Sequence, residues 1–228
     1  MTNIKAIFFD VDNTLLDFDL GAKTLMANLL EERGKKFEDE MFSTFTRINN
    51  GLWKTLERGE ITKDELYAVR WNRVFEAIGI DGIDGPDFEK YFKSGLHESA
   101  FLIDGATEIL AYLKPKYRLF AATNGGIAQQ TNRLEKSNLL GYFDGIFASE
   151  AIGFPKPTKE FFDKCFENAG GIKPEETLMI GDSPSADIIG AKNYGMKTLR
   201  FRFGNNINLE CKEADAEVYK LADIRNFL

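Results

Sequence analysis

The chain contains little cysteine, little histidine and no long hydrophobic run. Its two cysteines, Cys165 and Cys211, lie in different predicted elements and lack the CxxC spacing of thiolate metal sites. We therefore expect reduced thiols in a cytoplasmic protein, without a disulfide framework. The single histidine, His97, is expected to have a structural or exposed role.

Membrane and polymer partners are equally unsupported by the sequence. No stretch approaches the roughly 20 apolar residues of a membrane helix, and the short apolar run at the N-terminus ends in acidic residues, unlike a secretory signal. The net charge is −7, with acidic and basic residues interspersed. This balance argues against binding to nucleic acid polymers, but it does not exclude a single nucleotide in a pocket. We expect a monomer or weak dimer.

The most informative segment lies near the N-terminus. Residues 4–9 form an apolar run that leads directly into two carboxylates, Asp10 and Asp12. Such a run is typical of a strand buried on both faces of a parallel sheet, and ligands bind beyond the carboxyl ends of such strands. Two adjacent buried carboxylates repel one another and lose hydration, so a divalent metal is the simplest compensation.

The C-terminal part of the chain has the alternating pattern of βαβ units around a parallel sheet. The predicted strands are residues 118–123, 145–149, 177–181 and 197–201. The predicted helices between them are residues 127–138, 159–169 and 185–194. Residues 216–219 and 221–228 are expected to add an edge strand and a closing helix. With 228 residues, 43% of them apolar, the chain can bury one large core and a smaller second domain.

Residues 17–99 differ from this pattern, because they contain amphipathic helical stretches and no convincing strand. These stretches are residues 21–33, 39–57 and 62–78, and a glycine-rich loop follows at residues 79–85 with Pro86 beyond it. A block of this length is far longer than an ordinary crossover connection. We therefore predict a doubly wound α/β core domain of residues 1–16 and 100–228, with a helical domain of residues 17–99 inserted after its first strand.

Three further polar motifs fall at the ends of predicted strands. Thr123, Asn124 and Gly125 end one strand and open a helix, where a hydroxyl and backbone amides can face an anion. Taken alone, this is also ordinary turn chemistry. Lys156 lies between two prolines that restrict the backbone, although a loop lysine is usually just solvated.

The third motif follows the predicted strand at residues 177–181. Asp182 comes directly after that strand, and Asp187 lies in the first turns of the next predicted helix. Either Asp182 or Ser183 can be read merely as a helix cap. Taken together, however, four strand ends that carry three acidic positions and one basic position match a magnesium phosphoryl-transfer site better than chance capping.

These motifs occur in a set order along the chain. The set is Asp10-x-Asp12-x-Thr14, Thr123-Asn124, Lys156-Pro157 and Gly181-Asp182-x4-Asp187. It resembles the haloacid dehalogenase (HAD) superfamily of hydrolases over essentially the whole chain. The resemblance implies a Rossmann-like α/β core, and the inserted helical block corresponds to what the family calls a C1 cap. Further stretches are similar to the pyrimidine 5′-nucleotidases of this superfamily: Leu15-Leu16-Asp17-Phe18, Asn50-Gly51-Leu52-Trp53 and Ser149-Glu150-x-x-Gly153.

The resemblance implies a mechanism with specific roles. Asp10 would be the nucleophile that forms an aspartyl-phosphate. Asp12 would protonate the leaving oxygen and later deprotonate the attacking water. Mg²⁺ would be held by Asp10, the main-chain carbonyl of Asp12 and Asp182, with Asp187 orienting a metal-bound water.

The phosphate group of the substrate has its own implied partners. They are the Thr123 hydroxyl, the amides near Asn124 and Gly125, and the ammonium group of Lys156. The substrate would be a small phosphorylated metabolite, and the subfamily resemblance points to a pyrimidine nucleoside monophosphate.

The helical block would close over the site and recognise the leaving group. Phe18, Phe45 and Trp53 are candidates for stacking on a base, with Asn49 and Asn50 as polar contacts. Each has an alternative, because aromatic residues at helical spacing are often core and an Asn pair can lie on a polar helix face. Two basic residues of this block, Arg47 and Arg58, can be read either as contacts to an acidic substrate or as solvated side chains.

Other functions remain to be compared with this one. A sugar-phosphate phosphatase of the same superfamily would share every core motif. A dehalogenase needs no second acid, whereas this chain has Asp12, and a phosphomutase would be expected to carry Glu-Asp where this chain has Gly181-Asp182. A phospho-acceptor regulatory module would also group acids and a lysine around Mg²⁺, but without a large inserted domain.

Overall fold

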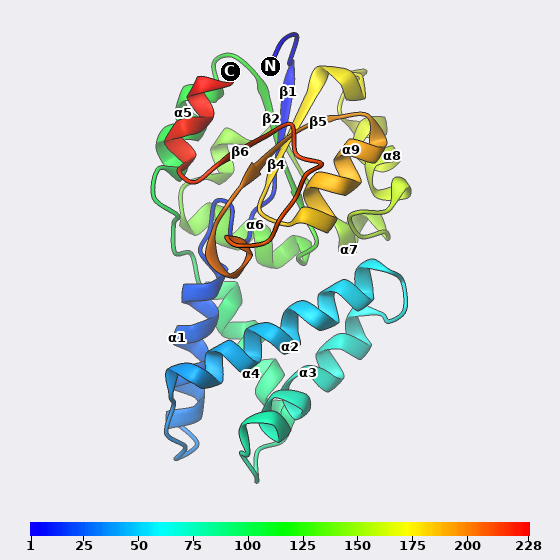
Figure 1. The fold of residues 1–228 in the computed structure, drawn as a ribbon. Helices are drawn as coiled ribbons and strands as arrows, with labels where there is room; N and C mark the ends of the chain where they lie inside the picture. Colours follow the sequence, from blue (N-terminus) through cyan, green and yellow to red (C-terminus); the bar gives the residue numbers. More distant parts are fainter. The chain divides into compact units, whose positions relative to one another are not determined.

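The computed structural model describes residues 1–228, apart from the side chain of Asn205. Six parallel strands form one sheet in the order β3-β2-β1-β4-β5-β6 (Figure 1). Their bounds are β1 Ala6–Phe9, β2 Arg118–Thr123, β3 Gly145–Ala148, β4 Thr177–Gly181, β5 Lys197–Phe201 and β6 Ala216–Val218. The predicted doubly wound α/β class is therefore confirmed.

Strand β1 shows why the sheet is covered on both faces. Ile7 and Phe9 belong to one apolar core, whereas Ala6 and Phe8 belong to a second core on the other face. Successive side chains of a strand point to opposite faces, so a fully apolar strand requires helices on both sides. The helices of this part are α5 Ala106–Leu113, α6 Ile127–Lys136, α7 Ser149–Ile152, α8 Lys159–Asn168 and α9 Gly190–Tyr194.

The observed elements differ from the predicted ones mainly at their ends. Strand β3 stops at Ala148, because α7 begins at Ser149. The predicted helix over 185–194 is divided into a π-helical segment, Pro184–Ile189, and α9. The closing helix is a 3₁₀ helix, Leu221–Asn226. Other 3₁₀ turns span Leu140–Tyr142, Pro174–Glu176 and Gly204–Asn206.

The chain divides into two compact units, residues 1–18 with 100–228 and residues 19–99. The helices associated with the second unit are α1 Phe18–Glu31, α2 Asp39–Glu57, α3 Lys63–Ile78 and α4 Gly85–Glu98. Helix α4 was not among the helices expected from sequence. Its start is nevertheless encoded, because Asp84 accepts a hydrogen bond from the amide of Asp87 at 2.8 Å and Pro86 lies in the first turn.

Aromatic side chains fill the interior of the helical unit. Trp71 is fully buried, and its ring lies 4.4 to 5.6 Å from the rings of Phe45, Phe75, Phe88 and Phe92. Aromatic pairs at this spacing contribute about 0.5–1.5 kcal/mol each beyond their burial. This unit therefore has a core of its own.

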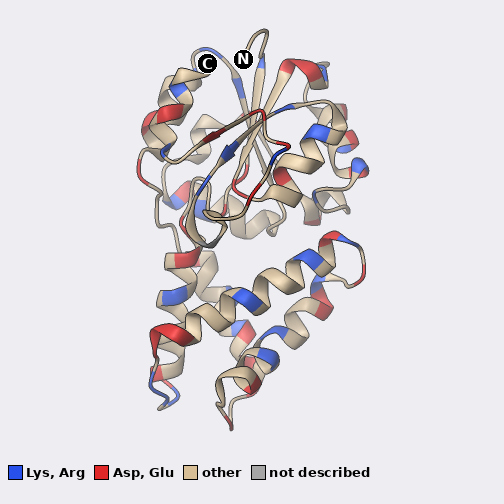
Figure 2. Cartoon of the chain, in the orientation of Figure 1, with Lys and Arg blue, Asp and Glu red and all other residues tan. Residues whose placement is uncertain are grey.

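The two ends of the helical insertion join neighbouring positions of the α/β unit. The amide of Asp17 donates to the carbonyl of Phe101 at 2.8 Å, and the amide of Ile103 donates to the carbonyl of Leu15 at 3.0 Å. The insertion thus leaves and re-enters the α/β unit at adjacent points. Acidic and basic residues are interspersed over the helices of both units (Figure 2). Within the described part of the chain, every helix is too short or too polar to cross a bilayer.

Candidate active site

The sheet topology places the candidate site. The chain order reverses between β1 and β4, which are adjacent in the sheet. In open α/β sheets the crevice beyond the carboxyl ends of the strands at this point is the usual ligand site. Asp10 follows β1 and Asp182 follows β4, while Thr123 ends the neighbouring strand β2. The topology therefore brings these residues to one edge of the sheet although they are far apart in sequence.

Lys156 links two of the aspartates at this edge of the sheet. Its ammonium group donates to Asp10 Oδ1 at 2.7 Å, to Asp187 Oδ1 at 2.7 Å and to the Ala122 carbonyl at 2.6 Å. The side chain is 1% exposed. Burial lowers the pKa of Lys156, but the two carboxylates of Asp10 and Asp187 outweigh it and raise the pKa above its ordinary value. Lys156 is therefore a permanent positive charge, and all three of its N–H donors are used.

Asn124 fixes the backbone of Lys156. Its side-chain oxygen accepts from the Lys156 amide at 2.8 Å, and its side-chain nitrogen donates to the Lys156 carbonyl at 3.0 Å. Ser149 holds Asn124 in turn by donating to its carbonyl at 3.1 Å. The phosphate-binding role predicted for the amides near Asn124 stays a prediction, and the side chain of Asn124 positions the lysine.

The hydroxyl of Thr123 has a defined orientation. Thr123 Oγ accepts from the Gly125 amide at 2.9 Å and from Gln130 Nε2 at 3.2 Å. A hydroxyl has two acceptor positions and one donor proton. Because both acceptor positions of Thr123 are filled, its proton can be donated to another acceptor, such as an anionic oxygen. The start of α6 is also engaged, because Glu150 accepts from the Ile127 amide at 2.9 Å.

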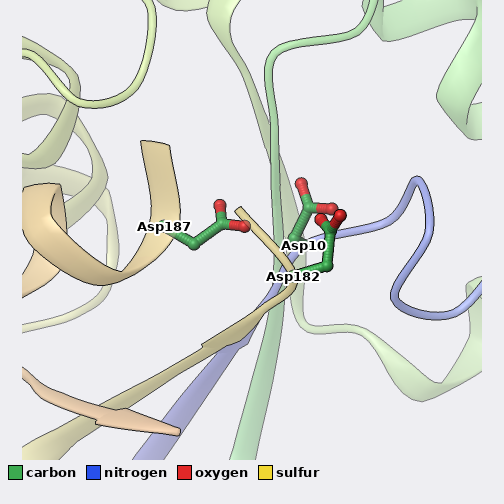
Figure 3. A group of neighbouring side chains, drawn as sticks. All are labelled: Asp10, Asp182 and Asp187. Atoms are coloured by element: carbon green, nitrogen blue, oxygen red, sulfur yellow. The ribbon is translucent and has the colours of Figure 1, made fainter. Parts of the chain in front are cut away.

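Three buried carboxylates face one another at the site. The ligand atoms of Asp10, Asp182 and Asp187 lie within 4.8 Å of one another (Figure 3). Burial raises the pKa of Asp10 to about 7, and Asp187 and Asp12 add to this although Lys156 opposes it. Burial, together with the charges of Asp10 and Asp187, raises the pKa of Asp182 well above its usual range.

This donor set fits a divalent cation. Three carboxylates share one ammonium group, so the ionised site carries an excess of negative charge that burial makes costly. Oxygen ligands grouped in this way suit hard cations. Asp10, Asp182 and Asp187 are the residues that could hold one.

Asp187 is positioned by the π-helical segment. Its Oδ2 accepts from the Ser183 amide at 3.0 Å, while its Oδ1 is paired with Lys156. Gly181 makes room for it, because a Cβ at that position would lie 2.2 Å from Asp187 Oδ2. The glycine before Asp182 is therefore required by the close approach of Asp187.

One side-chain partner of Asp182 was not expected from sequence. Asn206 Nδ2 donates to Asp182 Oδ2 at 2.6 Å. The buried guanidinium of Arg200 holds this segment by donating to the carbonyls of Asn206 and Leu209, both at 2.6 Å. Sequence pattern alone offers little signal for Asn206, because it lies in a polar turn far from the motif.

Asp12 also has partners that the sequence analysis missed. Gln130 Nε2 donates to its Oδ2 at 2.6 Å, and Arg133 Nη1 donates to its Oδ1. Both partners are fully buried on α6. The sequence does contain a hint of these contacts. Gln130 and Arg133 are three residues apart on the helix that follows Thr123 and Asn124, so they share one helix face.

The residues predicted to contact a base lie in different surroundings. Phe45 is buried in the aromatic core of the helical unit, and Asn49 Oδ1 accepts from the buried Arg70 at 2.9 Å. Trp53 packs half-buried against an apolar cluster of α2 and α3, while Phe18 and Asn50 are also half-buried. For Phe45 these contacts agree with the alternative, a core position, whereas Asn49 makes a buried contact with Arg70 and does not lie on a polar helix face.

The remaining basic candidates lie on the surface. Arg58 pairs with Glu60 at 2.5 Å and Arg47 is exposed. His97 is 3.9 Å from Glu98, and its side chain is 38% exposed. Contact of Arg47 or Arg58 with an acidic substrate stays a prediction.

Comparison with known proteins adds a family to this geometry. The model of the family of haloacid dehalogenase-like hydrolases matches residues 4–195. The crystal structure of the HAD-hydrolase YfnB of Bacillus subtilis, determined bound to magnesium, has a TM-score of 0.92 and 33% identity, covering 100% of this chain and 99% of that one.

Two curated relatives carry named activities. The pyrimidine 5′-nucleotidase PynA of Streptococcus pneumoniae is 35% identical over 98% of this chain and 94% of its own length. The glyceraldehyde 3-phosphate phosphatase of Pyrococcus furiosus is 28% identical over 100% of this chain and 93% of its own length. The chain, with its carboxylates and buried lysine at the switch point of the sheet, belongs to the family of haloacid dehalogenase-like hydrolases.

Proposed function

We propose that this protein is a Mg²⁺-dependent phosphomonoester hydrolase that forms an aspartyl-phosphate on Asp10 and acts on pyrimidine (deoxy)nucleoside monophosphates. One observation carries the proposal. A buried lysine bridges Asp10 and Asp187 at 2.7 Å each, beside Asp182, at the switch point of the sheet. The helical unit, residues 19–99, is proposed to be the cap domain of the family.

The proposed reaction has two displacements. A carboxylate oxygen of Asp10 attacks phosphorus while the bond to the leaving oxygen breaks, and Asp12 gives that oxygen a proton. Water then attacks the phosphoryl group on Asp10, Asp12 takes its proton, and inorganic phosphate leaves. Thr14 helps to fix Asp10, because its hydroxyl donates to Asp10 Oδ2 at 3.3 Å.

Phosphate binding is assigned to the positive and donor groups around Asp10. The charge of Lys156 and the hydroxyl proton of Thr123 favour the phosphate oxygens, and the backbone amides near Asn124 are proposed as further donors, whereas the Gly125 amide donates to Thr123 Oγ. Asp10, Asp182 and Asp187 would hold Mg²⁺, together with the main-chain carbonyl of Asp12. When bound, Mg²⁺ supplies positive charge that stabilises the phosphoryl group in the transition state.

The substrate assignment rests on the relatives rather than on the site. PynA is more similar to this chain than the glyceraldehyde 3-phosphate phosphatase, with 35% against 28% identity. The core motifs do not distinguish the two substrates, because they contact only the phosphate and the metal. A pyrimidine nucleoside monophosphate is therefore the first substrate to test.

A panel of phosphate esters tests the proposal. Phosphate release would be measured with Mg²⁺ on dUMP, dTMP, UMP, purine monophosphates and sugar phosphates including glyceraldehyde 3-phosphate, with Asp10→Asn as the blank. We expect a preference of about tenfold or more for pyrimidine nucleotides, which equals about 1.4 kcal/mol of transition-state discrimination. A flat profile or a sugar-phosphate preference would reject the nucleotidase assignment and keep the phosphatase mechanism.

A sugar-phosphate phosphatase is the second candidate, because a relative with that activity aligns over the full chain. A phospho-acceptor module is the candidate outside enzymology. Release of many phosphates per protein molecule would exclude it, whereas one phosphoryl group retained on each protein molecule, without turnover, would support it.

A further inference from the structure

Helix α6 carries a buried polar pair that the mechanism has not yet used. Gln130 and Arg133 are both fully buried. They lie three residues apart and therefore on one face of the helix. A fully buried guanidinium is costly unless it is paired and hydrogen-bonded, so its partner is informative.

The partner is the side chain of Asp12. Arg133 Nη1 donates to Asp12 Oδ1 and also to Gln130 Oε1, the latter at 3.2 Å. Gln130 Nε2 donates to Asp12 Oδ2 at 2.6 Å. Each oxygen of the carboxylate thus receives one hydrogen bond from α6, which fixes both the direction and the rotation of the group.

The pair is asymmetric in its exposure. The Arg133 side chain is 0% exposed, whereas the side chain of Asp12 is 31% exposed. A carboxylate has about four lone-pair positions, so two hydrogen bonds leave others for a substrate. The arginine therefore supports Asp12 from the protein side, while part of the Asp12 carboxylate still faces outward.

The same contacts link Asp12 to the phosphate-binding turn. Gln130 Nε2 also donates to Thr123 Oγ at 3.2 Å. Gly125 gives this amide its place, because a Cβ there would lie 2.3 Å from Gln130 Nε2. One glutamine thus sets the distance between the acid-base carboxylate and the hydroxyl that faces the phosphate.

We propose that Arg133 and Gln130 are positioning residues that hold the Asp12 carboxylate in the orientation for proton transfer with the leaving oxygen. The inference rests on the proposed function, because it takes Asp12 as the acid-base residue. Both side chains are fully buried and hydrogen-bonded to Asp12, so they would act through it. Errors of about 1 Å in the placement of such a group can cost on the order of 10²-fold in rate.

The test compares two leaving groups. An aryl phosphate such as p-nitrophenyl phosphate releases a stable anion that needs little protonation, whereas a nucleoside monophosphate releases an alkoxide that does. We would measure kcat/KM, which covers the steps up to release of the first product, for both substrates with the full-length protein and Mg²⁺. The variants are Asp12→Asn, Arg133→Met, Arg133→Lys and Gln130→Met.

We expect Arg133→Met to lower kcat/KM for the nucleotide about tenfold more than for the aryl phosphate, with partial recovery in Arg133→Lys. Gln130→Met should likewise lower kcat/KM more for the nucleotide than for the aryl phosphate. Because it removes no buried charge, it keeps the test valid if Arg133→Met does not fold. In the Asp12→Asn background, either substitution should cost less than about twofold, because the group it positions is already lost.

Ser137→Ala is the matched control, because Ser137 caps the C-terminal end of the same helix. Ser137 Oγ donates to the carbonyls of Arg133 and Leu134, at 2.8 and 3.1 Å, without touching Asp12. We expect it to leave the ratio of the two kcat/KM values unchanged.

Two results would overturn the inference, and they are distinguishable. In the first, Gln130→Met and Arg133→Met lower kcat/KM equally for both substrates, while Asp12→Asn lowers it more for the nucleotide. The pair would then be merely structural, and the proposed function would stand. If Asp12→Asn itself showed no leaving-group difference, the acid-base role of Asp12 would fail and this inference with it.

Discussion

Asp10 is placed in surroundings that favour its neutral form in the absence of metal. Burial raises its pKa to about 7, against an ordinary value of 3.8, and only Lys156 acts strongly in the opposite direction. A nucleophile must be ionised, so the site is built to be completed by further positive charge. The cost of ionising grouped, buried carboxylates therefore favours binding of the cation that the proposed reaction uses.

Replacing this nucleophile should separate chemistry from stability. We expect Asp10→Asn to lower phosphate release by at least about 10³-fold, because no aspartyl-phosphate can form. The same change should leave the metal-free protein at pH 8 equally or more stable, since it removes a buried negative charge. Phosphate release and thermal unfolding check the two halves, and a folded variant with substantial Mg²⁺-dependent turnover would contradict the role of Asp10.

The raised pKa values of Asp10 and Asp182 make stability depend on pH. The folded protein keeps a proton on Asp10 that the unfolded chain has already lost, so this stabilisation is fully present below about pH 4 and is lost as the pH rises to about 7. The metal-free protein should therefore lose up to a few kcal/mol of unfolding free energy over this range.

Mg²⁺ should have the opposite dependence on pH. Its ligands must be ionised, so Mg²⁺ should raise the unfolding temperature more at pH 8 than at pH 5.5. Thermal unfolding with and without Mg²⁺ at both pH values measures this, with Asp182→Asn as the variant that should lose most of the shift. A shift that is equal at both pH values would contradict the carboxylate site.

At this scale the sequence predicts the charged groups of the site better than their neighbours. Asp10 and Asp182 directly follow strands, and strand ends can be predicted from apolar runs. Lys156 lies beyond α7 and Asp187 lies within the π-helical segment, so these two are indicated by their local motifs rather than by a strand end. The contact of Asn206 to Asp182 depends on a turn held by tertiary hydrogen bonds, which leave no periodic pattern.

Among the elements, the π-helical segment after β4 has the clearest functional consequence. An α-helix over 185–194 fits the apolar periodicity, but the observed wider turn, Pro184–Ile189, is the segment that brings Asp187 to Lys156. π-Helical turns often mark functional sites. The periodicity of apolar residues did not reveal it, because the same apolar residues also fit an α-helix.

Gly181→Ala tests this segment. The added Cβ would lie 2.2 Å from Asp187 Oδ2, so Asp187 must move and Lys156 loses a partner. We expect phosphate release to fall by about tenfold or more, with a smaller Mg²⁺-induced rise in unfolding temperature. Gly141→Ala is the matched control, because a Cβ there meets nothing within 4 Å. Wild-type values for both measurements in Gly181→Ala would contradict the close approach.

The helical unit contains a buried ion pair between two of its helices. Arg70 of α3 donates to both carboxylate oxygens of Glu89 on α4, at 2.6 and 3.0 Å, and it lies over the rings of Tyr67 and Phe92. Burial raises the pKa of Glu89, although Arg70 opposes this. Each partner is therefore costly without the other.

Removing one member of this pair should be worse than removing both. We expect Arg70→Met to lower the unfolding free energy by about 3–5 kcal/mol, and Arg70→Met with Glu89→Met to recover a large part of that loss. Denaturant unfolding of the two single variants and the double variant measures the coupling. Strictly additive losses would show that the two side chains contribute independently.

The missed helix α4 illustrates the limit of reading elements from local signals. The glycines of residues 79–85 indicate a loop, and the structure has a left-handed Gly79 ending α3 with φ of 69°. Asp84 and Pro86 are standard signals for a helix start, and Phe88 and Phe92 then follow at helical spacing. The information was present, but the loop signals of the preceding residues dominated the interpretation.

For the whole molecule, the insertion of one unit into the other is the main organising feature. Residues 15–17 and 101–103 are paired by backbone hydrogen bonds of 2.8 and 3.0 Å, which bring together the two points where the chain leaves and re-enters the α/β unit. The α/β unit also contains both apolar cores of the sheet and every carboxylate of the candidate site. We therefore expect the α/β unit to fold and to form the candidate site without the helical unit.

Replacing residues 19–99 by a short Gly-Ser linker tests this independence. The points where the insertion leaves and re-enters the α/β unit are adjacent, so a short linker should span them with little strain. The entropic cost of closing this loop should also be smaller than for the native insertion. We expect cooperative unfolding and a Mg²⁺-induced rise in unfolding temperature to persist. Slow hydrolysis of p-nitrophenyl phosphate should remain, and Asp10→Asn in the same shortened chain should abolish it.

The same shortened chain should lose the preference among nucleotides, because all the residues predicted to contact the base except Phe18 would be gone while the phosphate partners remain. The measurement is the ratio of kcat/KM for dUMP and for glyceraldehyde 3-phosphate in the full and shortened chains. A ratio that falls toward one would assign selectivity to the helical unit. A ratio unchanged by the deletion would place the selecting residues in the α/β unit, and an unfolded shortened chain would refute its independence.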